Sequence, residues 1–356
     1  MRIVQIIDSL EAGGAERMAI NFANILVNKI EFSGLISTRK EGQLLNQIDE
    51  KVSYLFLRKE KKIDFMAVFR LRKYLKSNKI DIIHAHSSSF FIAVLTKFTL
   101  PSIKIIWHDH YGSRVKESKK RNRVLIFASF FFSSIFAVNL QLEQWSKKNM
   151  NCKNVIFVPN FVFGYSEVNG ITKLKGTVGK RMVFLANLKK PKNHILVLKA
   201  FFDLRLDKLD WSLHLIGKDY LDAYSEELKS FIKSNSLENH IHLYGEKNDV
   251  KTILLQASVG ILASTEEGFP VTLLEYALAE LAIVSTNVGY CSELVQNEVN
   301  GLLFSPVNQM EIKMQMEKIA KNEKLRADLA KNIKVKVERD YSEKTIVEML
   351  LQAYKK

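Results

Sequence analysis

Residues 259–281 read VGILASTEEGFPVTLLEYALAEL, and this stretch decides the fold class of the chain. Its first part, Val259–Ala263, is a short apolar run with the length and composition of a buried strand. A glycine-containing loop follows, and then an apolar helical pattern from Val271, with Pro270 at the predicted first helical position. This order leaves free backbone N–H groups and the positive end of a helix dipole at the loop, where they favour phosphate.

Two carboxylates belong to this loop and to the helix after it. Glu267 lies in the loop, and Glu275 lies about one turn into the predicted helix. Carboxylates are poor phosphate ligands, but each offers paired acceptors for the hydroxyl groups of a sugar. A phosphate-favouring helix start beside two such groups indicates a site for a sugar nucleotide.

Strand-like runs alternate with helical patterns along the rest of the chain, which is typical of parallel sheets with right-handed crossovers. Besides the stretch above, strands are predicted over residues 3–7, 80–84, 103–108, 135–139, 155–159, 182–186, 212–217, 240–245 and 282–285. Helices are predicted over residues 16–28, 64–76, 90–98, 124–134, 195–205, 224–234, 250–256, 310–323 and 342–356.

The chain has 356 residues, which is too long for one ordinary core and predicts two domains. A glycine-rich stretch without apolar periodicity, residues 164–180, is the predicted linker. It separates an N-terminal domain over 1–163 from a C-terminal domain over 181–338, and a C-terminal helix over 339–356 could pack back on the N-terminal domain. Ligands of such sheets bind at the carboxyl ends of the strands, so we expect a deep cleft between two facing Rossmann-like domains.

Composition and charge limit the compartment and the partners that the chain can have. Two cysteines without metal-ligand spacing indicate a reducing compartment, and we expect a cytoplasmic protein. The first residues, MRIVQIIDSL, predict a short strand rather than a signal peptide, and no apolar run reaches the roughly 18 residues of a spanning helix. The formal net charge of +15 favours anionic membranes, nucleic acid or phosphorylated substrates. Nucleic-acid-binding motifs are missing, so no nucleic-acid partner is expected.

Three further motifs accompany the glutamate loop. They are GGAE at 13–16, LKKPKNH at 188–194, and VGYCSELV at 288–295 with NGLLF at 300–304. In this order, and together with EGFPVTLLE at 267–275, they resemble the retaining glycosyltransferases of family 4, which have the two-domain GT-B fold. The resemblance covers nearly the whole chain. It implies transfer of a sugar from a nucleoside diphosphate (UDP- or GDP-linked) to a hydroxyl group.

The resemblance also implies roles for single residues. Glu275 matches the glutamate that accepts hydrogen bonds from the nucleotide ribose, and Glu267 matches the one beside the donor sugar. Lys192 matches the lysine on the donor diphosphate, where a cation stabilises the charge of the leaving group. Asn187 departs from the family, which usually has an arginine there, and Lys189 and Lys190 are alternative substitutes.

The remaining donor-binding predictions concern backbone positions. Glycines after the first strand would let the main chain approach the diphosphate or the acceptor, and the residues around the second helix start would face the sugar and phosphate. These predicted donor-binding residues are Gly13, Gly14, Gly245 (in the base pocket), Gly268, Phe269, Pro270 and Val271.

Histidines follow two successive predicted strands: His84 and His86 end one, and His108 and His110 the next. The family has a histidine near the second of these ends that faces the donor sugar. Either His108 or His110 could align with it, and we assign the catalytic role to His110, beside Glu267 and Lys192. The four come from different strand ends without a clear ligand set. We therefore expect no metal and no cofactor, and a structural or substrate-contact role for His84 and His86.

The acceptor is predicted to be a lipid-linked intermediate of a surface polysaccharide (O-antigen, capsule or exopolysaccharide). The helix over 64–76 carries Val68, Leu71 and Leu75 on one face and four basic residues on the others. It could lie on an anionic membrane surface, which would make the protein peripheral at the inner face of the cell membrane, or merely pack on the sheet. A sugar-nucleotide epimerase or phosphorylase of the same architecture is an alternative. A non-catalytic carbohydrate- or nucleic-acid-binding protein is the alternative of another class.

Overall fold

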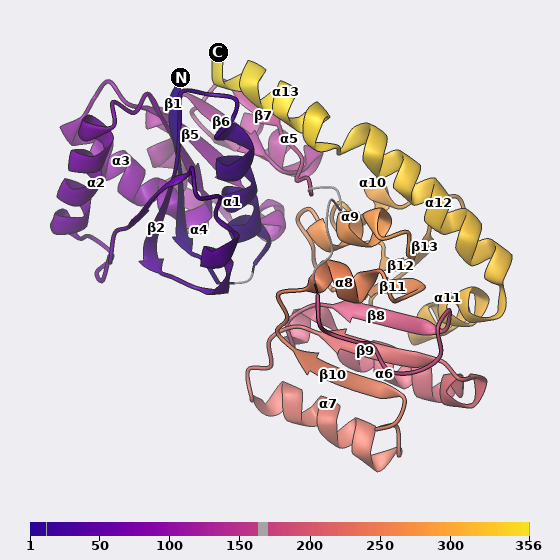
Figure 1. Ribbon diagram of the computed structural model, residues 1–356. Helices are drawn as coiled ribbons and strands as arrows, with labels where there is room; N and C mark the ends of the chain where they lie inside the picture. The colour runs from indigo at the N-terminus through magenta and orange to yellow at the C-terminus, as the bar shows by residue number, and fades with distance from the viewer. Residues whose placement is uncertain (12, 163–169, 356) are drawn as a thin grey trace. The chain divides into compact units, whose positions relative to one another are not determined.

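The structure is a computed structural model, and it describes residues 1–11, 13–162 and 170–355 (Figure 1). These residues form two compact units. Unit 1 comprises Met1–Phe161 and Glu343–Lys356, and unit 2 comprises Val162–Ser342. Each unit is built on one parallel sheet with helices packed against it, as the alternating pattern predicts.

Unit 1 contains a seven-stranded parallel sheet in the order β3-β2-β1-β4-β5-β6-β7. Its central strands are apolar nearly throughout, because helices cover both faces of a parallel sheet. Strands β2 and β3 were not predicted, since β2 mixes apolar residues with Ser33, Ser37 and Thr38, which are buried nonetheless. The strands are β1 (Arg2–Ser9), β2 (Phe32–Lys40), β3 (Ser53–Phe56), β4 (Ile82–His86), β5 (Lys104–Asp109), β6 (Ser134–Ala137) and β7 (Val155–Phe157).

The helices of unit 1 bury one apolar face each. In α2 this face holds Val68, Leu71 and Leu75, as predicted, and the side chain of Asp64 caps the helix by accepting a hydrogen bond from Ala67 N. The helix expected over 124–134 begins earlier and ends at Ala128, because a polar turn with an exposed outer face precedes its apolar part. The helices are α1 (Gly14–Leu26), α2 (Phe65–Ser77), α3 (Phe90–Thr99), α4 (Lys119–Ala128), α5 (Leu140–Asn149) and α13 (Glu343–Lys355).

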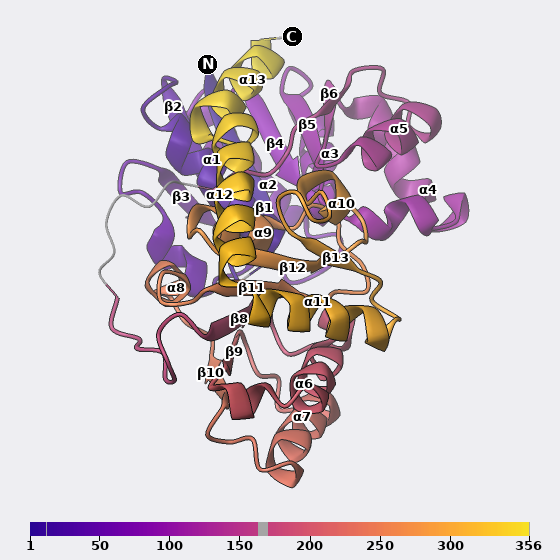
Figure 2. The same ribbon diagram turned by 90° about the vertical axis from the view of Figure 1, so that its right-hand side faces the viewer.

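The C-terminal helix α13 belongs to unit 1 although about 180 residues of unit 2 precede it. Figures 1 and 2 both show it alongside the sheet of unit 1. Tyr354, in its last turn, packs its ring against His84 of β4 and Phe136 of β6. The end of the chain is thus part of the core near the middle of the sheet.

Unit 2 contains a six-stranded parallel sheet in the order β10-β9-β8-β11-β12-β13. Helix α12 was not predicted as a separate element. The strands are β8 (Arg181–Leu185), β9 (Ser212–Ile216), β10 (Ile241–Gly245), β11 (Val259–Leu262), β12 (Ala282–Thr286) and β13 (Leu302–Phe304). The helices are α6 (His194–Asp203), α7 (Ala223–Ser234), α8 (Val250–Leu254), α9 (Val271–Leu278), α10 (Cys291–Leu294), α11 (Gln309–Lys321) and α12 (Glu323–Asp340).

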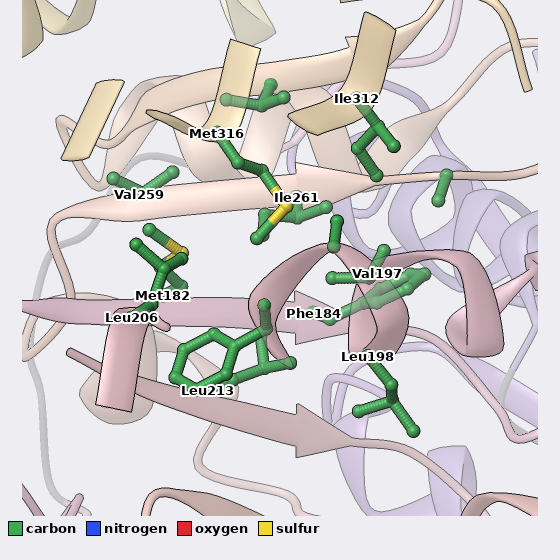
Figure 3. Packing of buried hydrophobic residues seen from close by; sticks show 14 of the residues in the cluster. Met182, Phe184, Val197, Leu198, Leu206, Leu213, Val259, Ile261, Ile312 and Met316 are labelled. Carbon is green, nitrogen blue, oxygen red and sulfur yellow. The ribbon is translucent and has the colours of Figure 1, made fainter. Parts of the chain in front are cut away.

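The core of unit 2 lies between its sheet and helices α6 and α11 (Figure 3). Side chains from β8, β9 and β11 interdigitate there with side chains from the two helices. The labelled members are Met182, Phe184, Leu213, Val259, Ile261, Val197, Leu198, Leu206, Ile312 and Met316. Among the residues that the structure describes, no helix combines the length and the apolar character that crossing a membrane requires.

The second half of the predicted linker is attached to unit 2. Residues 163–169 lie outside the described residues. The backbone N–H groups of Ile171 and Thr172 both donate to Asp249 Oδ2, at 3.0 and 2.8 Å, and Leu174 N donates to the side-chain oxygen of Gln256. These bonds make residues 171–174 a part of unit 2.

Candidate functional site

In unit 2 the order of the strands reverses between β8 and β11, which are adjacent in space but not in sequence: β9 and β10 follow on one side, and β12 and β13 on the other. Their pairing covers only the first residues of each strand, and Tyr276 of α9 bridges them further along. Its hydroxyl accepts a hydrogen bond from Leu185 N (2.8 Å) and donates to Ile261 O (3.1 Å). Gly260 leaves room for the ring, because a Cβ there would lie 2.4 Å from it. Such a switch point, at the carboxyl ends of the strands, is where open α/β sheets bind ligands.

Glu267 and Lys192 meet at this edge. Lys192 Nζ lies 2.6 Å from Glu267 Oε1, with 34% and 13% of the two side chains exposed. The loops that carry them are joined by their backbones as well, since Thr265 N donates to Pro191 O at 2.8 Å. Two residues 75 positions apart, predicted to act on the same donor, are therefore in direct contact.

Gly289 holds the next loop against Glu267. Its φ of +55° lies in the left-handed region, and a Cβ there would lie 1.9 Å from the carbonyl oxygen of Glu267. Beside it, the ring of Tyr290 stacks on Phe269 at 4.9 Å. Phe269 is buried, so it anchors the loop and does not offer its ring to solvent.

Glu275 lies in α9, half-buried, and Glu266 is exposed. The helix starts at Val271, and Pro270 is its N-cap rather than its first helical residue. The prediction was therefore wrong by one position, a usual uncertainty at helix ends. Proline suits either place, because it has no backbone N–H to satisfy.

Asn187 follows β8 and fixes a second loop. Its Oδ1 accepts a hydrogen bond from Lys218 N at 2.9 Å. Gly217 makes this approach possible, because a Cβ there would lie 2.2 Å from the carbonyl oxygen of Ala186. Gly217 N in turn donates to Gly245 O, so three strand ends meet at this point.

Two lysines gather on one ring beside this loop. Lys189 Nζ lies 4.5 Å and Lys218 Nζ 5.3 Å from the ring centre of Tyr220. Tyr220 and Lys189 also line a surface hollow of about 560 Å³. Lys218 was missed by sequence reasoning, because it comes from a different strand end than the motif at 188–194.

In unit 1, Gly13 and Gly14 lie where β1 leads into α1. Gly14 is the first helical residue, and the helix has no side-chain cap. A Cβ at Gly14 would meet nothing within 4 Å, whereas one at Gly13 would meet the flexible side chain of Glu16. Burial raises the pKa of this Glu16 carboxyl, which lies in the first turn of the helix.

The four histidines at the carboxyl ends of β4 and β5 form one cluster. The rings of His84 and His86 stack at 4.4 Å, and those of His108 and His110 lie 4.2 Å apart. Burial is the main cause that lowers all four pKa values, that of His110 to about 3. The four imidazoles are therefore neutral at physiological pH.

The cluster also has the composition of a metal site. Nitrogen atoms of His84, His86 and His108 all lie within 4.8 Å of one another. The sequence had given no clear ligand set, because the spacing alone does not show that β4 and β5 are neighbours with residues 84–86 facing 106–108. Apart from His108 Nε2, the ring nitrogens of these three histidines are hydrogen-bonded to side chains around them, so a metal ion that used them would have to replace those bonds.

The loop after His110 is held by an ion pair. Asp109 is fully buried, and Arg114 donates to both of its carboxylate oxygens, at 2.6 and 3.1 Å. Tyr111 N also donates to Asp109. These bonds to Asp109 fix the backbone at the end of β5, where His110 follows.

Both units of the chain match known glycosyltransferase families. Residues 12–162 match the family model described as Glycosyltransferase Family 4, and residues 173–336 match the one described as Glycosyl transferases group 1. The chain belongs to this glycosyltransferase family. The O-antigen biosynthesis glycosyltransferase WbnH of Escherichia coli is 26% identical over 304 residues, 84% of each chain.

A second relative of this glycosyltransferase is the UDP-Gal:alpha-D-GlcNAc-diphosphoundecaprenol alpha-1,3-galactosyltransferase of Escherichia coli. It is 25% identical over 317 residues, which are 82% of this chain and 80% of that one. Among solved structures, Anabaena Alr3699/HepE in complex with UDP superposes with a TM-score of 0.83 over 100% of both chains, at 17% identity. This likeness shows the fold, GT-B, with two Rossmann-like domains.

The predicted site residues of this glycosyltransferase fall into two groups. Gly13, Gly14 and His110 belong to unit 1, and the others belong to unit 2. Within unit 2 the structure brings Lys192, Glu267 and the loop of Phe269 together, and it places Asn187 and Gly245 at the ends of β8 and β10, on either side of β9.

Proposed function

We propose that this glycosyltransferase transfers a sugar from a nucleoside diphosphate to a hydroxyl group of a lipid-linked glycan intermediate, with retention of configuration. The observation that carries the proposal is the contact between Lys192 and Glu267, beside the start of α9 and at the switch point of unit 2. Two relatives support the acceptor and donor classes: one is named for O-antigen biosynthesis, and the other for a UDP-linked sugar and a diphosphoundecaprenol acceptor.

The roles follow from charge and position. Glu275 accepts hydrogen bonds from the ribose, and Lys192 stabilises the negative charge that develops on the diphosphate as the glycosidic bond breaks. Glu267 then holds a donor-sugar hydroxyl and stabilises positive charge on the anomeric carbon. Lys218 and Lys189, over Tyr220, compensate for the arginine that is missing at Asn187.

In this proposal the reaction needs no metal ion and no cofactor. The bond between the anomeric carbon and the diphosphate oxygen breaks, the acceptor oxygen bonds on the same face, and its proton passes to the leaving diphosphate. Lysines supply the positive charge that a divalent cation would otherwise supply. Activity that survives EDTA supports this proposal, and activity that returns only with added Mg²⁺ or Mn²⁺ contradicts it.

A thermal-shift panel of UDP-, GDP- and ADP-sugars tests the donor site, because a ligand that binds only the folded state raises its melting temperature. We expect one nucleotide class to stabilise the protein. Glu275→Gln should weaken binding by roughly 10- to 100-fold, because hydrogen bonds to a charged group contribute about 1.5–3 kcal/mol. Glu266→Gln, which changes an exposed glutamate of the same loop, is the matched control. No response to any nucleotide sugar would contradict the proposal.

We also propose that unit 1 meets an anionic membrane through the outer face of α2. This face exposes large apolar side chains: Phe65 is 70%, Met66 65% and Phe69 57% exposed. Ten lysines and arginines lie within residues 51–80 against two acidic residues. An exposed aromatic stripe with a basic rim has the chemistry of a surface that inserts shallowly into anionic lipid.

Sedimentation with vesicles tests this surface. The protein should sediment with phosphatidylglycerol-containing vesicles at low salt, and much less at high salt or with neutral phosphatidylcholine vesicles. A Phe65→Ser/Phe69→Ser double variant should lose most of this binding. The matched control is Met310→Ser/Met314→Ser, which removes two side chains that are equally exposed, 60% each, from α11 of unit 2. Equal losses in both double variants would contradict the proposed surface.

A further inference from the structure

Two rows of hydrogen bonds run through the histidine cluster of unit 1, and one side chain touches both. In the first row, Tyr354 Oη lies 2.7 Å from His84 Nδ1, and His84 Nε2 lies 3.1 Å from His108 Nδ1. In the second, Gln5 Oε1 lies 2.9 Å from His86 Nε2, and His86 Nδ1 lies 3.0 Å from His110 Nε2. Gln5 joins the rows, because its Nε2 donates to Tyr354 Oη at 3.4 Å.

Both rows end at a nitrogen without a partner. Within the described part of the chain, His108 Nε2 and His110 Nδ1 are buried and make no hydrogen bond. A neutral imidazole has one N–H donor and one acceptor nitrogen. A ring that accepts a hydrogen bond at one nitrogen must therefore donate at the other, and the reverse. The first partner in a row thus decides whether the last nitrogen is a donor or an acceptor.

The second row starts at an oxygen. Because Gln5 Oε1 can only accept, His86 carries its proton on Nε2 and accepts on Nδ1. The proton of His110 then lies on Nε2, and its buried Nδ1 is left as an acceptor.

The first row starts at a hydroxyl. Tyr354 already accepts from Gln5, so its own O–H is donated to His84 Nδ1, since a buried hydroxyl without an acceptor would be costly. His84 then donates through Nε2 to His108, and His108 Nε2 carries a proton.

We propose that Gln5 is a positioning residue that sets the tautomers of all four histidines, and so makes His110 Nδ1 a hydrogen-bond acceptor and His108 Nε2 a donor. A rotation of the Gln5 amide by half a turn would reverse every bond in both rows and exchange these two roles. Tyr354, in the last turn of α13, transmits the orientation of the Gln5 amide to the first row, because its hydroxyl accepts from Gln5 and donates to His84. As far as the ligand is concerned, the inference rests on the proposed function: an acceptor at His110 fits a sugar hydroxyl that donates.

Nitrogen-15 NMR of protein labelled at histidine reads these tautomers directly, without substrate. All four rings should carry the proton on Nε2 at neutral pH, and their signals are assigned with single histidine variants. Tyr354→Phe should change only His84 and His108, and Gln5→Leu should change all four. Tyr74→Phe removes another phenol of unit 1, one bonded to Ser53, and should change none.

Several outcomes would overturn the proposal. Protons on Nδ1 of His86 and His110 in the wild-type protein would reverse the assignment, and this spectrum requires no variant to fold. Unchanged signals in Tyr354→Phe would show that the rows are not set from their ends. Signals that change on treatment with EDTA and return with Zn²⁺ would show that a metal, rather than Gln5, fixes the tautomers.

A second arm tests the ligand. When UDP-glucose is added, the Nδ1 signal of His110 should shift. The Nδ1 signal of His194, in unit 2, should not show this shift. If UDP-glucose stabilises the protein but leaves His110 unchanged, the acceptor role is wrong while the donor site stands. If it does not bind, the proposed donor is wrong, and the tautomers measured without ligand still decide the role of Gln5.

Discussion

Gly289 shows how much of the donor site depends on single residues. It does not contact substrate in our proposal, yet its lack of a side chain lets one loop lie against the backbone of Glu267. The motif at 288–295 predicted only that this segment resembles the family. The reason for the glycine is visible when its φ and its neighbour are known together.

Gly289→Ala should therefore lower both stability and donor binding. Gly179→Ala is a matched control, because Gly179 also has a positive φ, of +85°, but a Cβ there would meet nothing within 4 Å. The control should lose about 1 kcal/mol from backbone strain alone. Gly289→Ala should lose more, and its melting temperature should respond less to the nucleotide sugar that stabilises the wild type. Equal losses, with equal donor responses, would show that contact with Glu267 does not matter.

At the scale of elements, the sequence predicts what is encoded locally. The strand at 259–263 and the helix after it were found because an apolar run and a proline are neighbours in the chain. Strand β2 was missed, because its buried Ser33, Ser37 and Thr38 look like a surface segment. The contact between Gln5 and Tyr354 spans 349 positions and leaves no local signal.

The candidate site divides in the same way. Lys192 and Glu267 were predicted to act on one donor because each lies in a motif of fixed spacing, and the structure brings them into contact. The ribose-binding role of Glu275, from the same motif, stays a prediction. Lys218 could not be predicted, because it reaches the site through a hydrogen bond from its backbone to Asn187 and a ring contact with Tyr220. Residues that act through tertiary contacts become visible only when the strand order is known.

At the scale of the whole molecule, buried histidines link stability to pH. Burial lowers the pKa values of the four in unit 1 and, in unit 2, those of His194 to about 4 and His214 to about 3. Unfolded histidines titrate near 6.5. Below that pH the unfolded chain binds more protons than the folded one, so the free energy of unfolding falls as the pH falls.

His194 offers a test of this linkage at one residue. It is fully buried and stacked on Phe184 at 4.3 Å, which leaves room for a phenyl ring. His194→Phe removes one proton-binding group that is neutral when folded. Relative to this variant, the wild type should lose roughly 1.4 kcal/mol per pH unit as the pH falls from about 6.5 towards 4, and nothing above pH 7. Melting temperatures of both proteins at pH 7.5, 6.5 and 5.5 measure the difference. A difference in melting temperature that stays constant over this pH range would show that His194 takes up a proton as readily in the folded protein as in the unfolded chain.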